Sequence, residues 1–269
     1  MELSNTTGIV TGASRGIGVF IAEALADKGV SLALAARSAD DLAHTAERIT
    51  GRGIKAIAIP TDVTKREDLE SLVERTTREL GPVDLLINNA GVEMVGYFER
   101  LDPDGIERAI HVNLTSLIFL TRLVVPSMIE RGRGHVCNIA SAAGKAARPY
   151  GSVYSATKHG VVGFSWSLRA ELGTSGVEVS VVCPSYVSDV GMFARRDAGK
   201  PPRALATCTP EEVARQVVKS IETNRAEVVV GSPIVRLSDV VHALSPDLAI
   251  SIGKRGPYRF LKREATGSE

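Results

Sequence analysis

Short apolar runs alternate with longer amphipathic segments along most of the 269-residue chain. Runs with little polar alternation, such as residues 177–183, are typical of strands buried on both faces. Strands that alternate with helices favour parallel pairing through right-handed crossovers. We therefore expect an α/β fold, a single-domain doubly wound parallel sheet (Rossmann) with helices on both faces. The predicted strands are residues 8–10, 32–36, 54–59, 83–87, 136–139, 177–182 and 228–230.

Helical periodicity fills most of the gaps between these runs. In the first predicted helix Ile17, Ile21 and Leu25 fall on one face, and Gly29 is placed to end the helix. Thr209 is the predicted N-cap of the last one. No linker-like stretch divides the chain, so we treat residues 1–269 as one domain. The other predicted helices are residues 40–50, 65–80, 103–113, 114–128, 161–172 and 210–223.

The composition excludes several classes of protein. Lys and Arg number 32 against 31 for Asp and Glu, so no charge excess favours a nucleic-acid partner. Three cysteines without metal-ligand spacing predict no metal site and suit a reducing compartment. Residues 233–253 are apolar but interrupted by charged residues and proline, so we expect no membrane span. No signal peptide is visible, and we expect a cytoplasmic protein.

Two predicted helices, residues 114–128 and 161–172, are apolar almost all the way round. The outer face of a helix that covers a sheet is normally polar, so such a helix needs a second partner. A deeper internal core would satisfy this requirement, but we favour association of subunits, as a homodimer or homotetramer.

A glycine-rich turn follows the first predicted strand and opens the first helix. Glycine permits a tight turn, and the free amides at a helix N-terminus bind phosphate. The placement predicts a dinucleotide pyrophosphate site, although a lone Gly-rich turn is weak evidence. The candidate residues are Gly12, Ser14, Arg15, Gly16, Ile17 and Gly18.

The second predicted strand ends in Ala36, Arg37 and Ser38. A carboxylate near this position holds the ribose hydroxyls of NAD, whereas an arginine accommodates the 2′-phosphate of NADP. Arg37, together with Arg15 in the turn, therefore favours NADP(H) over NAD(H).

Further cofactor contacts are predicted at the ends of the next two strands, where ligands bind in open α/β sheets. Asp62 could equally be the N-cap of the helix that follows. After the fourth strand, the small residues Ala90 and Gly91 would let an adenosine lie flat against the chain. The candidates are Asp62 and Val63 after the third strand, and Asn89, Ala90 and Gly91 after the fourth.

Tyr154 and Lys158 are spaced to share one helix face. A nearby cation favours the phenolate, which makes Tyr154 a candidate general acid and base. Ser141, at the end of the fifth predicted strand, could hydrogen-bond the reacting oxygen or simply form a local turn. Asn113 ends a predicted helix, where its amide could satisfy helix carbonyls.

These motifs, in this order and spacing, resemble those of the short-chain dehydrogenase/reductase family over at least residues 6–184. The resemblance implies Tyr154 as acid and base, with Ser141 orienting the substrate. It implies that Lys158 binds the nicotinamide ribose and lowers the Tyr154 pKa, and that Asn113 holds a proton-relaying water. The two arginines resemble those of NADP(H)-preferring members, and the apolar helices correspond to the usual subunit contact.

The match loosens after the sixth strand. Pro184 and Val187 stand where the family contacts nicotinamide, but Ser185 replaces a glycine and Asp189 a threonine. We expect residues 185–205 to form a substrate loop and residues 232–269 a C-terminal extension. Further substrate contacts are expected from residues 93–98 and 144–151.

The residues therefore predict an oxidoreductase that transfers a hydride between NADP(H) and a carbonyl or secondary alcohol. The alternative is a catalytically idle dinucleotide-binding sensor or scaffold, which would have no need of Tyr154 and Lys158 together. A lyase or epimerase on the same fold has no specific support. The expected partner is a small-molecule carbonyl or alcohol substrate.

Overall fold

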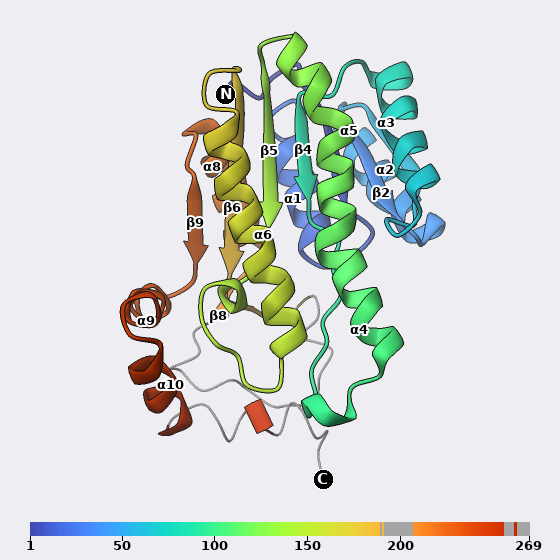
Figure 1. The fold of residues 1–269 in the computed structure, drawn as a ribbon. Coiled ribbons are helices and arrows are strands. Elements are labelled where there is room, and N and C mark those ends of the chain that lie inside the picture. The colour runs from blue at the N-terminus through green and yellow to red at the C-terminus, as the bar shows by residue number, and fades with distance from the viewer. Residues whose placement is uncertain (189, 191–206, 256–260, 263–269) are drawn as a thin grey trace.

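The computed structural model describes residues 1–188, 190, 207–255 and 261–262. One seven-stranded sheet has the order β3-β2-β1-β4-β5-β6-β9, and every pair in it is parallel. This order confirms the predicted doubly wound sheet (Figure 1). The strands are β1 Thr7–Thr11, β2 Ser31–Ala36, β3 Ala56–Pro60, β4 Leu85–Asn88, β5 Gly134–Ile139, β6 Val177–Pro184 and β9 Glu227–Val230.

Helices cover both faces of the sheet. On one face, helix α1 (Ile17–Ala26) contacts both α2 (Ala39–Thr50) and α8 (Pro210–Glu222). Helices α3 (Arg66–Leu80), α5 (Ser116–Glu130) and α6 (Ser152–Glu171) lie on the other. As predicted, Thr209 caps α8, since its Oγ1 accepts a hydrogen bond from Glu212 N over 3.1 Å.

One continuous helix replaces the two predicted for residues 103–128. It consists of α4 (Pro103–Ile110), a π-helical turn over His111–Thr115, and α5. Asn113 therefore lies inside this helix and does not end it, which corrects the sequence interpretation. By length and composition alone Pro103–Glu130 could cross a membrane. Instead α5 covers the sheet, with buried side chains that include Leu120 and Met128.

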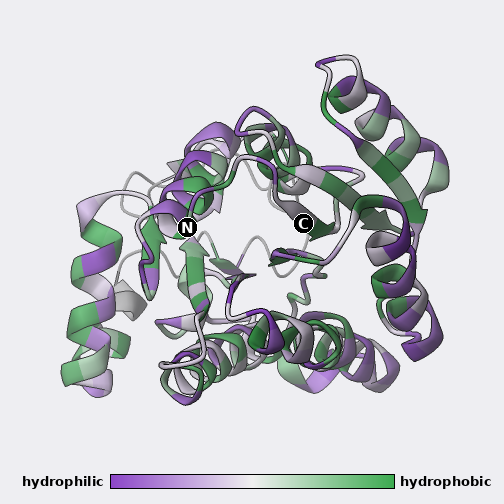
Figure 2. Cartoon of the chain, turned by 90° about the horizontal axis from the view of Figure 1, so that it is seen from above, coloured by the Kyte–Doolittle hydropathy of each residue, from purple (hydrophilic) through white to green (hydrophobic). Residues whose placement is uncertain are grey.

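The outer faces of α5 and α6 carry apolar side chains, as the sequence predicted. Ile118, Phe119 and Ile129 on α5 and Trp166 on α6 are exposed in the monomer. Seen from above, the helices carry both hydrophilic and hydrophobic residues (Figure 2).

The C-terminal segment forms α9 (Pro233–Leu244) and α10 (Pro246–Arg255), which lie beyond the carboxyl ends of the strands (Figure 1). A short two-stranded sheet, β7 (Tyr186–Val187) with β8 (Thr207–Cys208), precedes α8. Most of the predicted substrate loop, including Asp189 and residues 191–205, lies outside the described residues.

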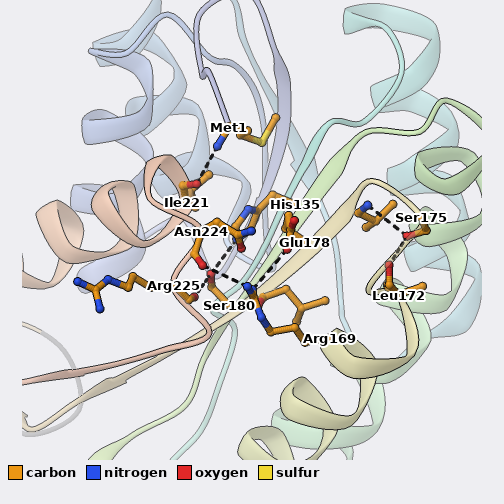
Figure 3. A network of polar contacts seen from close by, with 12 residues as sticks. Met1, His135, Arg169, Leu172, Ser175, Glu178, Ser180, Ile221, Asn224 and Arg225 are labelled. Atoms are coloured by element: carbon orange, nitrogen blue, oxygen red, sulfur yellow. Dashed lines mark hydrogen bonds and ion pairs between the residues drawn. The ribbon is translucent and has the colours of Figure 1, made fainter.

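A network of polar contacts connects distant segments of the chain near the amino ends of the strands (Figure 3). The ring of buried His135 lies 2.9 Å from Ser180 Oγ, which donates to Arg225 O over 2.5 Å. The amino group of Met1 donates to Ile221 O over 2.9 Å. Burial lowers the pKa of His135 to about 3, so its ring is neutral at physiological pH. We therefore assign a structural role to His135 and no role in catalysis.

Candidate active site

A cavity of about 1490 Å³ lies at the carboxyl ends of the strands. It is lined by the segments that follow β1 to β6 and by side chains of α9 and α10. All predicted site residues line this cavity except Gly18 and Asn113, which are buried behind it. The lining predicted residues are Gly12, Ser14, Arg15, Gly16, Ile17, Arg37, Ser38, Asp62, Val63, Asn89, Ala90, Gly91, Ser141, Tyr154, Lys158, Pro184 and Val187.

The glycine-rich turn has the backbone geometry that a phosphate site needs. Gly12 and Gly16 have φ angles of 68° and 64°, which side chains rarely allow. A Cβ on Gly18 would clash with Gly12 O, so the turn and α1 approach closely only because Gly18 has no side chain. Within the described chain, no side chain caps the amino end of α1. Its amides are therefore available to a pyrophosphate, and the turn fits a dinucleotide.

Hydrogen bonds between Asn89 and the start of the turn hold the turn in place. Asn89 Nδ2 donates to Thr11 O over 2.9 Å and to Gly12 O over 3.2 Å. Thr11 Oγ1 accepts from Asn89 N and Ala90 N over 2.9 Å and 3.0 Å. The sequence alone assigns no role to Thr11, although its place at the start of the turn is a signal. Asn89 thus supports the turn as well as lining the cavity.

Arg15 and Arg37 line the cavity, and both are exposed at its rim. Asp41, which the sequence analysis missed, also lines the cavity and accepts a hydrogen bond from Ser38 Oγ over 2.8 Å. This carboxylate is therefore already engaged at the start of α2.

Asp62 forms a turn and does not cap α3, whose N-cap is Lys65. This corrects one of the two roles considered for it. Its Oδ1 accepts hydrogen bonds from Thr64 N and Thr64 Oγ1 over 3.0 Å and 2.8 Å. Burial acts to raise the Asp62 pKa, but these bonds and the charge of Arg37 outweigh it and lower the pKa. Asp62 therefore presents a carboxylate to the cavity.

Tyr154 and Lys158 lie on one face of α6, and both side chains are buried. The Lys158 Nζ lies 5.8 Å from the centroid of the Tyr154 ring. Burial lowers the pKa of Lys158 to about 8. The two groups predicted to carry acid–base chemistry thus share the cavity with the glycine-rich turn.

Ser141 begins a 3-10 turn over Ala142–Gly144, two residues after β5 ends at Ile139. Its Oγ accepts a hydrogen bond from Ala143 N over 3.1 Å, which confirms a local turn. Ser155 Oγ donates to Ala143 O over 2.6 Å and so fixes this turn against α6. Ser141 and Tyr154 consequently line the same cavity from two elements that are bonded together.

Asn113 holds the segment that follows β4. Its Oδ1 accepts from Val92 N over 2.7 Å, and its Nδ2 donates to Val92 O over 2.8 Å. The same Nδ2 donates to Thr157 Oγ1 on α6 over 3.1 Å. The side chain therefore joins the wall of the cavity to the helix of Tyr154, a link that the sequence did not reveal.

The fold and the cavity define a nucleotide-binding α/β protein, and comparisons with known proteins identify its family. The family model described as short chain dehydrogenase matches residues 6–201. The chain therefore belongs to the short chain dehydrogenase family.

Several relatives are enzymes with named activities. The chain is 44% identical over 255 residues to ketoacyl reductase HetN of Nostoc sp., covering 95% of this chain and 86% of that one. It is 34% identical over 185 residues to D-beta-hydroxybutyrate dehydrogenase of Cupriavidus necator, covering 69% of this chain and 72% of that one. These similarities support an NAD(P)-dependent enzyme of this family.

Solved structures agree with the fold. A variant of actinorhodin polyketide ketoreductase with NADPH has a TM-score of 0.80 at 31% identity, covering 87% of this chain and 98% of that one. A short chain dehydrogenase/reductase from Burkholderia phymatum with NAD has a TM-score of 0.82 at 25% identity, covering 92% of this chain and 96% of that one. The neighbours thus bind both kinds of nicotinamide dinucleotide.

Proposed function

We propose that the protein transfers a hydride between NADP(H) and a carbonyl or secondary alcohol, with Tyr154 as general acid and base. One observation carries the proposal: the buried pair of Tyr154 and Lys158 opens onto the cavity that the glycine-rich turn also lines. The named relatives include a ketoacyl reductase, which supports reduction of a ketone.

Four polar residues have a part in the proposed reduction. NADPH, when bound, supplies the hydride to the carbonyl carbon. The Tyr154 hydroxyl gives its proton to the carbonyl oxygen, and the Ser141 hydroxyl hydrogen-bonds that oxygen. Protonated Lys158 stabilises the phenolate that remains on Tyr154. Asn113 keeps Val92 and Thr157 in place around these groups.

The preference for NADP(H) rests on Arg15 and Arg37 at the rim of the cavity. Guanidinium groups bind phosphate through paired, charge-assisted hydrogen bonds. Asp41 is a carboxylate in the same lining that could instead hold ribose hydroxyls, but it already accepts a hydrogen bond from Ser38 Oγ.

The substrate side of the cavity is largely apolar. Helices α9 and α10 contribute Ile234, Leu237, Val241 and Ile250 to the lining. Such a wall favours a ketone that carries a sizeable apolar group, such as an acyl chain. The C-terminal extension therefore belongs to the substrate site.

We also infer a homo-oligomer in the cytoplasm. The exposed apolar side chains of α5 and α6, Phe119 and Trp166 among them, suit a contact with a second copy. The three cysteines are buried free thiols, as in proteins of reducing compartments. Size-exclusion chromatography with light scattering at micromolar concentration tests the assembly, and a monomer would contradict it.

Oxidation of NADPH, followed at its nicotinamide absorbance, tests the proposed activity. The panel contains ethyl acetoacetate, a β-ketoacyl thioester of N-acetylcysteamine and a medium-chain aliphatic ketone. We expect turnover with at least one of them. Tight NADPH binding without turnover on any carbonyl would instead support an idle sensor.

A further inference from the structure

Glu93 and Arg148 form a buried ion pair in the wall of the cavity. Arg148 Nη1 lies 2.6 Å from Glu93 Oε1, and the two side chains are only 12% and 10% exposed. Both residues line the cavity. Neither belongs to the residues assigned above to the cofactor or to proton transfer.

The pair stands beside the reacting phenol. The guanidinium carbon of Arg148 lies 5.8 Å from the Tyr154 ring centroid and 5.3 Å from the Tyr186 ring centroid. The segments that carry the pair are also joined by a hydrogen bond from Gly96 N to Tyr150 O over 2.8 Å. The positions of both charges are therefore fixed where a substrate would meet Tyr154.

A buried ion pair changes which substrates such a pocket can accept. The Arg148 charge is compensated by Glu93 and is not available to a second carboxylate without competition. A carboxylate on the substrate would lose its water and also face the like charge of Glu93. An uncharged substituent meets neither obstacle.

We propose that the Glu93–Arg148 pair is a specificity element that selects uncharged carbonyl substrates, esters and thioesters among them, against free keto acids. This inference rests on the proposed function and adds the charge of the substrate to it. Removing the negative charge of Glu93 while Arg148 keeps its positive charge would favour a carboxylate at this wall of the cavity.

The test compares two substrates that differ in charge. Acetoacetate carries a carboxylate, whereas ethyl acetoacetate has the same keto group and no charge. The wild-type protein is expected to have the higher kcat/KM with the ester. Glu93→Gln is expected to raise the ratio of kcat/KM for acetoacetate over that for the ester by about tenfold or more. Arg148→Gln is expected to lower this ratio, because it removes a positive charge while the negative charge of Glu93 remains.

Two controls keep the result specific. Glu99→Gln removes an exposed carboxylate from the same segment and should leave the ratio unchanged. The double variant Glu93→Gln with Arg148→Gln should lose the gain, since it removes both charges of the pair together. NADPH binding by fluorescence checks that each variant is folded.

An unchanged ratio in folded Glu93→Gln, or a gain that persists in the double variant, would overturn the inference. Wild-type turnover of the ester would leave the proposed function intact in that case. A wild-type protein that reduces neither substrate, nor any other carbonyl, would instead count against the proposed function itself.

Discussion

Lys158 Nζ donates a hydrogen bond of 2.9 Å to the main-chain carbonyl oxygen of Ile139, the last residue of β5. This contact joins the helix of Tyr154 to the strand end that leads to Ser141. It also places a cation in a buried position, where loss of hydration disfavours the charged form. The site therefore keeps Lys158 at a cost in stability.

Lys158→Met is expected to stabilise the fold while it abolishes most activity. The folded pKa of Lys158, about 8, lies below its ordinary value of 10.5. Between pH 8 and pH 10.5 the unfolded chain therefore binds more protons than the native state does. Burial of the charged Lys158 thus destabilises the native state below pH 8. This penalty disappears as the pH rises toward 10.5. We expect the free energy of unfolding to rise by about 1–2 kcal/mol at pH 7. We expect kcat to fall by about 100-fold.

Urea unfolding of both proteins from pH 7 to 9.5 measures the effect, and the advantage of the variant should shrink across that range. A variant less stable than the wild type at pH 7 would show that the bond to Ile139 outweighs the burial of the charge.

Arg15→Ala with Arg37→Ala is expected to remove the preference for NADPH. Each guanidinium that bonds the 2′-phosphate contributes about 1.5–3 kcal/mol. The ratio of kcat/KM for NADPH over NADH should therefore fall by about 10-fold or more. Steady-state kinetics with the two cofactors measure it, and Arg78→Ala on the exposed side of α3 is the matched control. An unchanged ratio would assign cofactor selection to other residues.

Asp239→Asn is expected to stabilise the protein at neutral pH. Asp239 is a buried residue of α9, and burial raises its pKa to about 6, helped by Glu227 and opposed by Lys145. Because this pKa is raised, protonation of Asp239 stabilises the native state. This stabilisation is fully present below about pH 4 and is lost as the pH rises through 6. The variant should gain about 1–2 kcal/mol at pH 8.

Thermal unfolding at pH 4.5 and pH 8 checks this prediction. The stabilities of Asp239→Asn and the wild type should differ less at the lower pH. An equal difference at both values would mean that the carboxylate is not the cause.

The fold could be predicted because local patterns dictated most of it. Short apolar runs without polar alternation that lie between helical segments favour buried strands, and the turn from Thr11 to Gly18 requires glycine for its backbone. The spacing of Tyr154 and Lys158 places them together on any helix. These features depend on near neighbours in the chain, which the sequence displays directly.

The parts that could not be predicted depend on contacts between distant segments. Glu93 and Arg148 are 55 residues apart, in irregular segments whose paths no periodicity defines. The bonds of Asn113 to Val92 arise from a π-helical turn that no residue type signals. The position of α9 over the cavity is likewise set by packing at the end of the sheet.

Tyr154→Phe tests the central claim most directly, because it removes one hydroxyl and keeps the ring in its place. Turnover of the preferred carbonyl should fall by about 100-fold or more, while the Kd for NADPH, measured by fluorescence, should change less than about twofold. Turnover close to that of the wild-type protein, with NADPH bound equally well, would contradict the assignment of Tyr154 as the proton donor.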